Sequence, residues 1–139
     1  MDKFKEIRPI VLGVLTKDNK LLVSEGYDEV KKQYFYRCLG GGIEFLEKSD
    51  EALKREFKEE IGKDILIKDF LGISENIFTF NGKNGHELIM LYRVTLDEND
   101  YKEVYYDEGD TNFPIVWVDI DDIKSGKAII YPTIVEKYL

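Results

Sequence analysis

The stretch GGGIEFLEKSDEALKREFKEEIG, residues 40–62, decides the fold of this chain. It opens with three glycines, which mark a break in a strand-like region, and continues in residues that favour a helix. Ser49 or Asp50 is a good N-cap for that helix, and Gly62 stands where a left-handed C-cap would end it. The sequence therefore predicts a Gly-rich turn followed by a helix of about three turns.

This helix gathers carboxylates on one face. At 100° per residue, with Glu56 at zero, Glu60 falls at about 40° and Glu59 at about −60°. Three apolar residues fall between about 60° and 140°: Leu53, Phe57 and Ile61. Packing this apolar face on a sheet would hold the carboxylates beside the Gly-rich loop. Like charges this close destabilise a helix by about 0.2–0.5 kcal/mol per pair, so folding alone gives no reason for them.

A hard divalent cation gives such a reason. Mg²⁺ takes oxygen ligands and is usually shared between a protein carboxylate and the phosphates of a substrate. The chain has 139 residues, with 20 basic and 28 acidic side chains and a net charge of −8. A bound cation would let this acidic protein attract a phosphorylated ligand, so the cluster links metal to phosphate.

The same stretch resembles the signature box of the Nudix hydrolases, over residues 41–63, of a bacterial single-domain type. The matching positions are Gly41, Glu47, Arg55, Glu56, Phe57, Glu59, Glu60 and Gly62. Lys63 stands where the box ends in an aliphatic residue, and Leu46 stands where a glycine usually precedes the first glutamate. The usual proline before the glycines is absent as well. These departures concern the helix exit and the shape of the loop.

The resemblance implies an α/β fold, namely a Nudix-type α/β/α sandwich with a mixed β-sheet, formed by residues 1–139 as a single domain. It implies metal-dependent cleavage of a nucleoside diphosphate linked to another moiety, by attack of water at phosphorus. The substrate would be a nucleoside triphosphate, an oxidised nucleotide or an ADP-ribose-like compound. Mg²⁺ is the implied cofactor, with Mn²⁺ as a substitute.

The resemblance also assigns roles to single residues. The expected metal ligands are Glu56, Glu59, Glu60 and the backbone carbonyl of Gly40 or Gly41. The expected catalytic residues are Glu56 (a ligand or the base acting on water), Arg55 with Glu47 (which orient the acids) and Glu108 from a later loop. Three other acids are alternatives to Glu108: Asp107, Glu103 and Glu87.

Substrate binding is expected at Gly41, Gly42, Tyr36 and Arg37. Glycine backbone can approach a phosphate or a metal closely. One of the aromatic residues 34–36 could stack on a nucleobase, although alternation along a strand favours burial of one face in the core.

The rest of the chain is rich in strands, predicted at residues 7–16, 21–27, 34–39, 65–80, 86–96 and 113–120. NGKNG at 81–85 predicts a hairpin turn. Residues 97–112 are interpreted as a loop, with an edge strand at KEVYY as the alternative. A short helix is predicted at 121–126, and a terminal helix with Pro132 in its first turn. Hairpins without regular strand and helix alternation favour a mixed sheet.

The composition and charge of the chain limit the kinds of partner that it can bind. The chain is 43% hydrophobic and 13% aromatic, as expected of a folded domain, and its net charge of −8 speaks against nucleic acid as a partner. MDKFKEIRPI lacks the apolar core of a signal peptide, and the longest apolar runs are too short to span a bilayer. We therefore expect a cytoplasmic protein with a small-molecule nucleotide substrate and no membrane partner. A homodimer remains open.

Two alternative functions remain open. A nucleotide-sensing module with this fold would bind its ligand without cleaving it, and it could lose the acids of the box, all of which this chain keeps. An RNA 5′-end pyrophosphohydrolase would need a basic channel, which a chain of this charge does not suggest.

Overall fold

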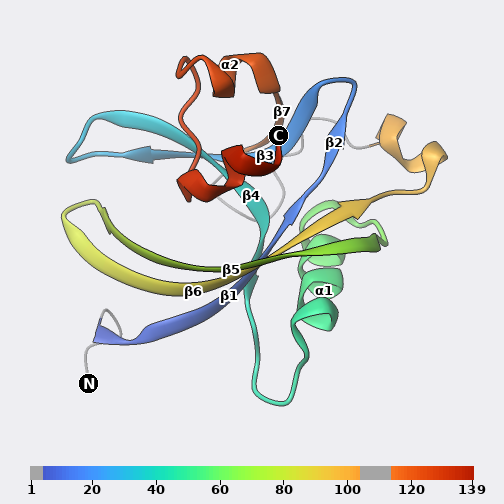
Figure 1. Ribbon diagram of the computed structural model, residues 1–139, viewed down its shortest axis with the longest axis horizontal. Helices are drawn as coiled ribbons and strands as arrows, with labels where there is room; N and C mark the ends of the chain where they lie inside the picture. The colour runs from blue at the N-terminus through green and yellow to red at the C-terminus, as the bar shows by residue number, and fades with distance from the viewer. Residues whose placement is uncertain (1–4, 104–113) are drawn as a thin grey trace.

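The computed structural model describes residues 5–103 and 114–139 (Figure 1). The strands are β1 (Ile7–Val14), β2 (Thr16–Lys17), β3 (Lys20–Asp28), β4 (Gln33–Gly42), β5 (Leu66–Phe80), β6 (Lys83–Thr95) and β7 (Ile115–Asp119). The helices are α1 (Ser49–Ile61) and α2 (Ile120–Lys124), with 3-10 helices η2 (Glu98–Glu103) and η3 (Thr133–Tyr138).

The strands form one mixed sheet. Its order is β2-β3-β4-β1-β6-β5, and β7 also pairs with β3. The central strand β1 runs antiparallel to β4 and parallel to β6, while β5 and β6 form a long antiparallel hairpin. The predicted mixed sheet is thus confirmed.

Alternation along β1 separates the two layers that cover the sheet. Ile10 and Leu12 belong to a core cluster that includes buried residues of α2 and η3. Val11 faces the other way, into a cluster that contains Leu53 and Phe57 of α1. Figure 1 shows α1 on one side of the sheet and α2 with the C-terminal segment on the other. The α/β/α sandwich is therefore confirmed, and the apolar face of α1 packs on the sheet as predicted.

Three element boundaries differ from the prediction. The glycines at 40–42 continue β4 and are not a turn, because each pairs with a residue of β1. Asn81 and Gly82 both have positive φ and close a two-residue turn, so β6 begins at Lys83 and not at residue 86. Pro132 precedes the terminal helix η3 instead of lying in its first turn.

Helix α1 begins differently from the prediction as well. Lys48 is its N-cap residue and makes no side-chain cap hydrogen bond. The Ser49 hydroxyl is used elsewhere, in a 2.7 Å hydrogen bond with the Tyr92 hydroxyl of β6. The helix ends as predicted, at Gly62 with φ 70°. Within the part of the chain that the structure describes, no helix is long and apolar enough to cross a membrane.

Candidate active site

The site forms where the end of β4 runs beneath α1. Gly40 has φ 149°, and a Cβ there would collide with the Val11 carbonyl oxygen of β1. At Gly41 the Oε1 atom of Glu56 lies 2.5 Å from where a Cβ would stand. The glycines are needed because sheet backbone and helix carboxylates meet without space for side chains.

Arg55 holds several acids in place. Its Nε donates to Glu47 Oε2 at 2.8 Å and its Nη2 to Glu47 Oε1 at 3.0 Å, which confirms the expected pairing of these residues. Its Nη1 donates to Glu56 Oε1 at 3.0 Å, and Nη2 also donates to the Gly42 carbonyl at 3.0 Å. Hydrogen bonds from Arg55 and from the backbone of Glu44 lower the pKa of Glu47. Glu47 is therefore a charged anchor for the arginine.

Glu56 and Glu60 are the acids that face the glycines. The Glu56 side chain is 16% exposed, and burial raises its pKa although Arg55 opposes the rise. Burial and the nearby charge of Glu56 raise the pKa of Glu60 to about 8, against a hydrogen bond from the Gly40 backbone. The Glu60 Oε2 atom is buried and has no hydrogen-bond partner among the described residues. This pair thus contains a polar atom that no residue of 5–103 or 114–139 satisfies.

Glu59 takes a different position from the prediction. Its side chain is 59% exposed, and its carboxylate oxygens lie 3.4 Å from Arg55 Nη1. Among residues 5–103 and 114–139, no group of three or more His, Cys, Asp or Glu side chains is close enough to hold a metal ion. The Glu59 oxygens contact Arg55 while Glu60 accepts a hydrogen bond from the Gly40 backbone, so the role of all three carboxylates as ligands stays a prediction.

A divalent cation nevertheless fits the residues present. Glu56 and Glu60 offer only oxygen donors, which Mg²⁺ and Mn²⁺ accept as ligands. The unsatisfied Oε2 of Glu60 would gain a partner, and the repulsion between the two carboxylates would be relieved. The fit rests on this unsatisfied oxygen and on the raised pKa of both acids.

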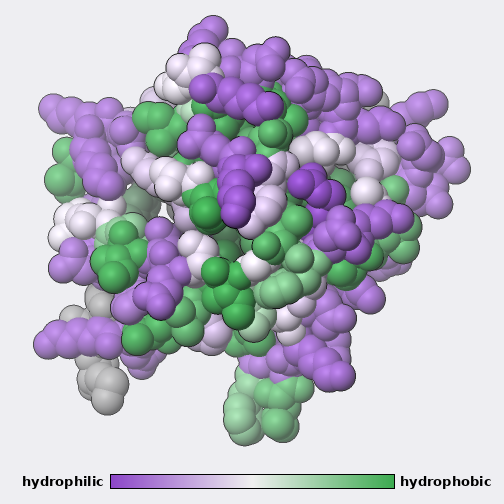
Figure 2. Space-filling view, in the orientation of Figure 1, coloured by the Kyte–Doolittle hydropathy of each residue, from purple (hydrophilic) through white to green (hydrophobic). Residues whose placement is uncertain are grey.

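The loop between β4 and α1 projects from the molecule beside this site. Leu46, at the box position where a glycine is usual, has φ 70° and is 89% exposed, and Phe45 is 93% exposed. The hydrophobic knob at the lower edge of Figure 2 lies where Figure 1 shows this loop. The leucine therefore keeps the left-handed backbone that a glycine would supply, at a cost in strain.

A cavity of about 420 Å³ runs from Gly41 to Asp28, between the β3–β4 and β5–β6 hairpins. Its aromatic lining consists of Phe35, Phe78, Phe80 and Tyr131. Arg37 lines it as well, whereas Tyr36 faces the other side of β4, near Trp117 and Asp122. Of the aromatic residues 34–36, Phe35 is thus the one that lines this cavity, on the same face of β4 as Arg37, whereas the substrate role predicted for Tyr36 stays a prediction.

The other predicted acids are Glu108, with Asp107, Glu103 and Glu87 as alternatives. Glu108 and Asp107 lie outside the described residues, and Glu103 is the last residue of η2. Glu87 lines the cavity and is bound to Arg37.

Sequence reasoning missed most of the residues that line the cavity, among them Arg8 and Asn76. Arg8 and Glu87 are partners in the parallel pairing of β1 and β6, and Asn76 is opposite Glu87 in the β5–β6 hairpin. Polar side chains at one register of three adjacent strands were the available signal, but reading it requires the strand order.

Comparison with known proteins identifies the family. A model of the NUDIX domain matches residues 6–137. The fold is similar to a Nudix hydrolase from Nitrosomonas europaea, with 22% identity, 95% of this chain and 85% of that chain covered, and a TM-score of 0.61. It is also similar to a Nudix-family hydrolase from Clostridium perfringens, with 18% identity, 96% of this chain and 95% of that chain covered, and a TM-score of 0.61. A mutator MutT protein from Bacillus halodurans has 17% identity, with 94% of this chain and 80% of that chain covered and a TM-score of 0.66. No curated protein sequence matches the chain. Because the domain model spans nearly all of it, the chain belongs to the Nudix family of hydrolases, which act on phosphoric anhydrides.

Proposed function

We propose that this protein is a metal-dependent pyrophosphohydrolase that cleaves a nucleoside diphosphate linked to another moiety. The observation that carries the proposal is the pair Glu56 and Glu60 against Gly40 and Gly41, with one buried carboxylate oxygen left unsatisfied. The pair adjoins a cavity of about 420 Å³ that is large enough for a nucleoside.

Glu56 and Glu60 would hold the cation, which we propose to be Mg²⁺, with Mn²⁺ as a substitute. When bound, the cation would lower the pKa of water and neutralise charge that develops on the phosphoryl oxygens. Arg55 keeps Glu56 against Gly41 through its hydrogen bond, while Glu47 and the Gly42 carbonyl fix Arg55 itself. Glu59 is exposed and contacts Arg55 at 3.4 Å, and it would supply a third carboxylate to the cation.

The position of Arg8 supports the proposal that the substrate is an anion. It is exposed, it lines the cavity, and its Nη2 lies 3.6 Å from the Cβ position of Gly42. The other cations of the cavity are engaged, since Arg37 binds Glu87 and Lys31 donates to the Thr79 carbonyl. Arg8 makes no ion pair within the described part of the chain, so it remains available for the phosphate chain in a protein of net charge −8.

The aromatic lining supports a nucleoside as the other part of the substrate. Phe35 and Phe80 make an edge contact at 5.7 Å, and Phe35 and Tyr131 meet at 5.8 Å. Such a wall suits the flat face of a base. Together, the carboxylates, Arg8 and the aromatic wall would bind metal, phosphate and base in that order along the cavity.

The test is hydrolysis of a substrate panel by the purified protein at mildly alkaline pH. The panel contains nucleoside triphosphates, oxidised purine nucleotides, ADP-ribose, dinucleotides and 5′-triphosphorylated RNA, each with Mg²⁺, with Mn²⁺ and with EDTA. We expect release of a nucleoside monophosphate from at least one compound, and loss of the activity in EDTA. Binding of a nucleotide without product from any compound would replace the proposal with the sensing module, and cleavage of RNA alone would replace it with an RNA 5′-end hydrolase.

A further inference from the structure

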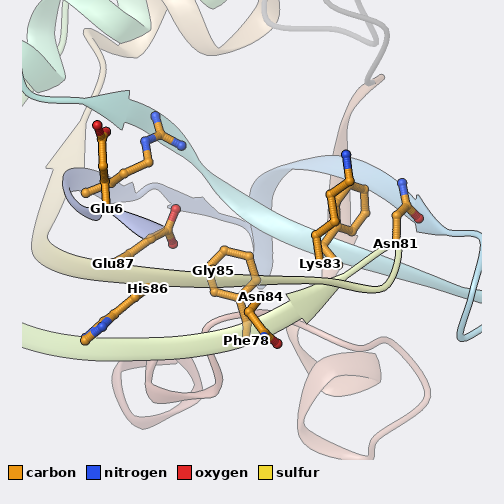
Figure 3. A pocket seen from close by; sticks show the side chains of 10 residues that line it. Glu6, Phe78, Asn81, Lys83, Asn84, Gly85, His86 and Glu87 are labelled. Atoms are coloured by element: carbon orange, nitrogen blue, oxygen red, sulfur yellow. The ribbon is translucent and has the colours of Figure 1, made fainter. Parts of the chain in front are cut away.

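The cavity contains a buried carboxylate that the proposed chemistry does not use. Glu87 on β6 is 4% exposed, and it lines both the 420 Å³ cavity and an adjoining cavity of about 660 Å³. The two cavities share four residues: Arg8, Phe78, Phe80 and Glu87. In Figure 3, which shows the larger cavity, Glu87 and its neighbour His86 point to opposite sides of β6. Glu87 is thus directed into the space that the hairpins enclose.

The contacts of Glu87 leave one oxygen available. Arg37 Nη2 donates to Oε1 at 3.0 Å, and Asn76 Nδ2 donates to the same Oε1 at 3.4 Å. Oε2 makes no hydrogen bond with any residue that the structure describes. Arg37 balances the negative charge, which makes burial of the carboxylate tolerable, and Oε2 keeps its lone pairs free of the residues around it in the described structure. Unlike Glu60 Oε2, Glu87 Oε2 is not a fully buried atom without a partner, so it is open to the cavity, where a donor from a ligand can reach it.

The surroundings of Oε2 indicate the donor. Phe35, Phe78 and Phe80 line the same cavity, so a flat aromatic ring would lie against them and present its edge to the carboxylate. A carboxylate accepts and does not donate, so it favours an edge with N–H groups and disfavours one with ring nitrogens or carbonyls. Among the common bases, only the guanine edge carries two adjacent donors, N1–H and N2–H₂.

We propose that Glu87, held by Arg37 and Asn76, is a specificity-determining residue that accepts hydrogen bonds from the N1–H and 2-amino groups of a guanine-type base. The assignment rests on the proposed function, because it takes the base to be part of a nucleotide whose phosphates lie at Gly41 and Arg8. The ribose hydroxyls are a second source of adjacent donors, and the experiment separates them from the base.

The experiment compares kcat/KM for GTP, ITP and dGTP in the native protein and in Glu87→Gln. ITP lacks only the 2-amino group, so we expect the native protein to favour GTP over ITP by about 10- to 100-fold. Glu87→Gln should bring this ratio close to one while GTP and dGTP stay in their native ratio. An equal loss for all three nucleotides would overturn the proposal in favour of a structural role, and a change confined to the GTP to dGTP ratio would assign Glu87 to the sugar.

His86→Gln is the matched control, since His86 neighbours Glu87 but points away from it. Its GTP to ITP ratio should equal the native one. If Glu87→Gln fails to fold, as judged by circular dichroism, Glu87→Asp retains the charge and withdraws the carboxylate, and it should also reduce the ratio. An unchanged ratio in Glu87→Asp would contradict the proposal.

Binding of the products separates this inference from the proposed hydrolysis. Calorimetric titration with GMP and IMP needs no turnover, and we expect GMP to bind more tightly by a similar factor in the native protein only. Equal affinity for GMP and IMP would overturn the inference even when hydrolysis occurs. Glu87-dependent preference for GMP without hydrolysis of any nucleotide would leave the inference standing and remove the proposed reaction.

Discussion

Two regions of the molecule treat their buried acids in opposite ways. At the glycine corner, where residues 40–42 meet α1, Glu56 and Glu60 lie near each other, and the Glu60 Oε2 atom has no hydrogen-bond partner in the part of the chain that the structure describes. At the hairpin tips, Asp28 is only 2% exposed yet fully engaged: it accepts from the Val30 and Lys31 backbone at 3.0 and 2.9 Å and from the Asn81 backbone at 3.2 Å.

The difference teaches how to separate a binding site from a structural joint. An acid whose hydrogen bonds are made by its own chain stabilises the fold, and its substitution lowers the free energy of unfolding. An acid without hydrogen-bond partners lowers the free energy of unfolding until a ligand binds, and its substitution lowers ligand binding or activity. Substitutions in the two regions should therefore move different quantities.

The largest effect is expected from Glu56→Gln at the glycine corner. Removal of this charge takes away a proposed ligand or base, so kcat should fall by about 10²- to 10⁴-fold on whichever substrate the panel identifies. The melting temperature should change little, because the carboxamide still fits beside Gly41. Glu51→Gln, on the exposed first turn of the same helix, is the control and should keep native kcat. Native activity in Glu56→Gln would remove this acid from the mechanism.

Glu60→Gln should alter stability in a pH-dependent way. Its pKa of about 8 in the folded protein exceeds the 4.5 of the unfolded chain, so the folded state holds a proton that unfolding releases between these values. Without metal, native stability should fall as pH rises from about 4.5 to 8, by on the order of 5 kcal/mol, and the variant should lose this decline.

The measurement is thermal unfolding at pH 5 and pH 8 in EDTA, repeated with Mg²⁺. Mg²⁺ should raise the melting temperature of the native protein at pH 8 by several degrees and that of the variant by much less. A native protein whose stability does not decline in EDTA would show that Glu60 is satisfied in solution, and the contrast between the two regions would then fail.

Gly41→Ala tests the closeness of backbone and carboxylate. The new Cβ would meet the end of the Glu56 side chain, which is able to move away, so the cost should fall on activity and not on the fold. We expect kcat to fall about tenfold, with about 1 kcal/mol or less of lost stability. Gly62→Ala is the matched control: it has φ 70° and no atom within 4 Å, so it should lose about 1 kcal/mol of stability and keep native kcat. A reversed pattern would show that Gly41 serves the fold alone.

The two regions also differ in how far the sequence predicts them. The glycine corner is formed by residues of one contiguous stretch of sequence, so helix periodicity places Glu56 and Glu60 on one face without knowledge of the fold. The cavity is assembled from distant residues: Arg37 and Glu87 are 50 positions apart, and Asp28 and Asn81 are 53 apart. Their pairing depends on strand order and register, which propensities do not encode.

Within the corner, two details escaped prediction for physical reasons. A glycine run indicates close backbone approach equally in a turn and in a strand, so continuation of β4 could not be distinguished from a break. Helix geometry fixes the direction of a side chain but not its rotamer, so the departure of Glu59 toward Arg55 required the structure.

The smallest effect is expected from Asp28→Asn at the hairpin tips. Hydrogen bonds from the backbone of Lys31, Asn81 and Val30 lower the pKa of Asp28 below its ordinary value of 3.8. The charge therefore contributes stability that is present above about pH 4 and is lost as pH falls through the lower pKa of the folded state. Asparagine keeps an acceptor oxygen, so the loss at neutral pH should be modest, and kcat should stay native.

The measurement is the difference in melting temperature between the native protein and Asp28→Asn at pH 7 and pH 3, with Asp64→Asn, whose side chain is 90% exposed, as the control. The difference should shrink toward pH 3, because protonation removes the charge that the substitution removes. Hydrogen exchange should quicken at residues 28–31 and 79–82 in the variant, since the Asp28 bridge joins these two turns. If instead kcat falls and the melting temperature is unchanged, Asp28 behaves like the acids of the glycine corner. Hydrogen bonds within the chain would then not be enough to identify an acid as purely structural.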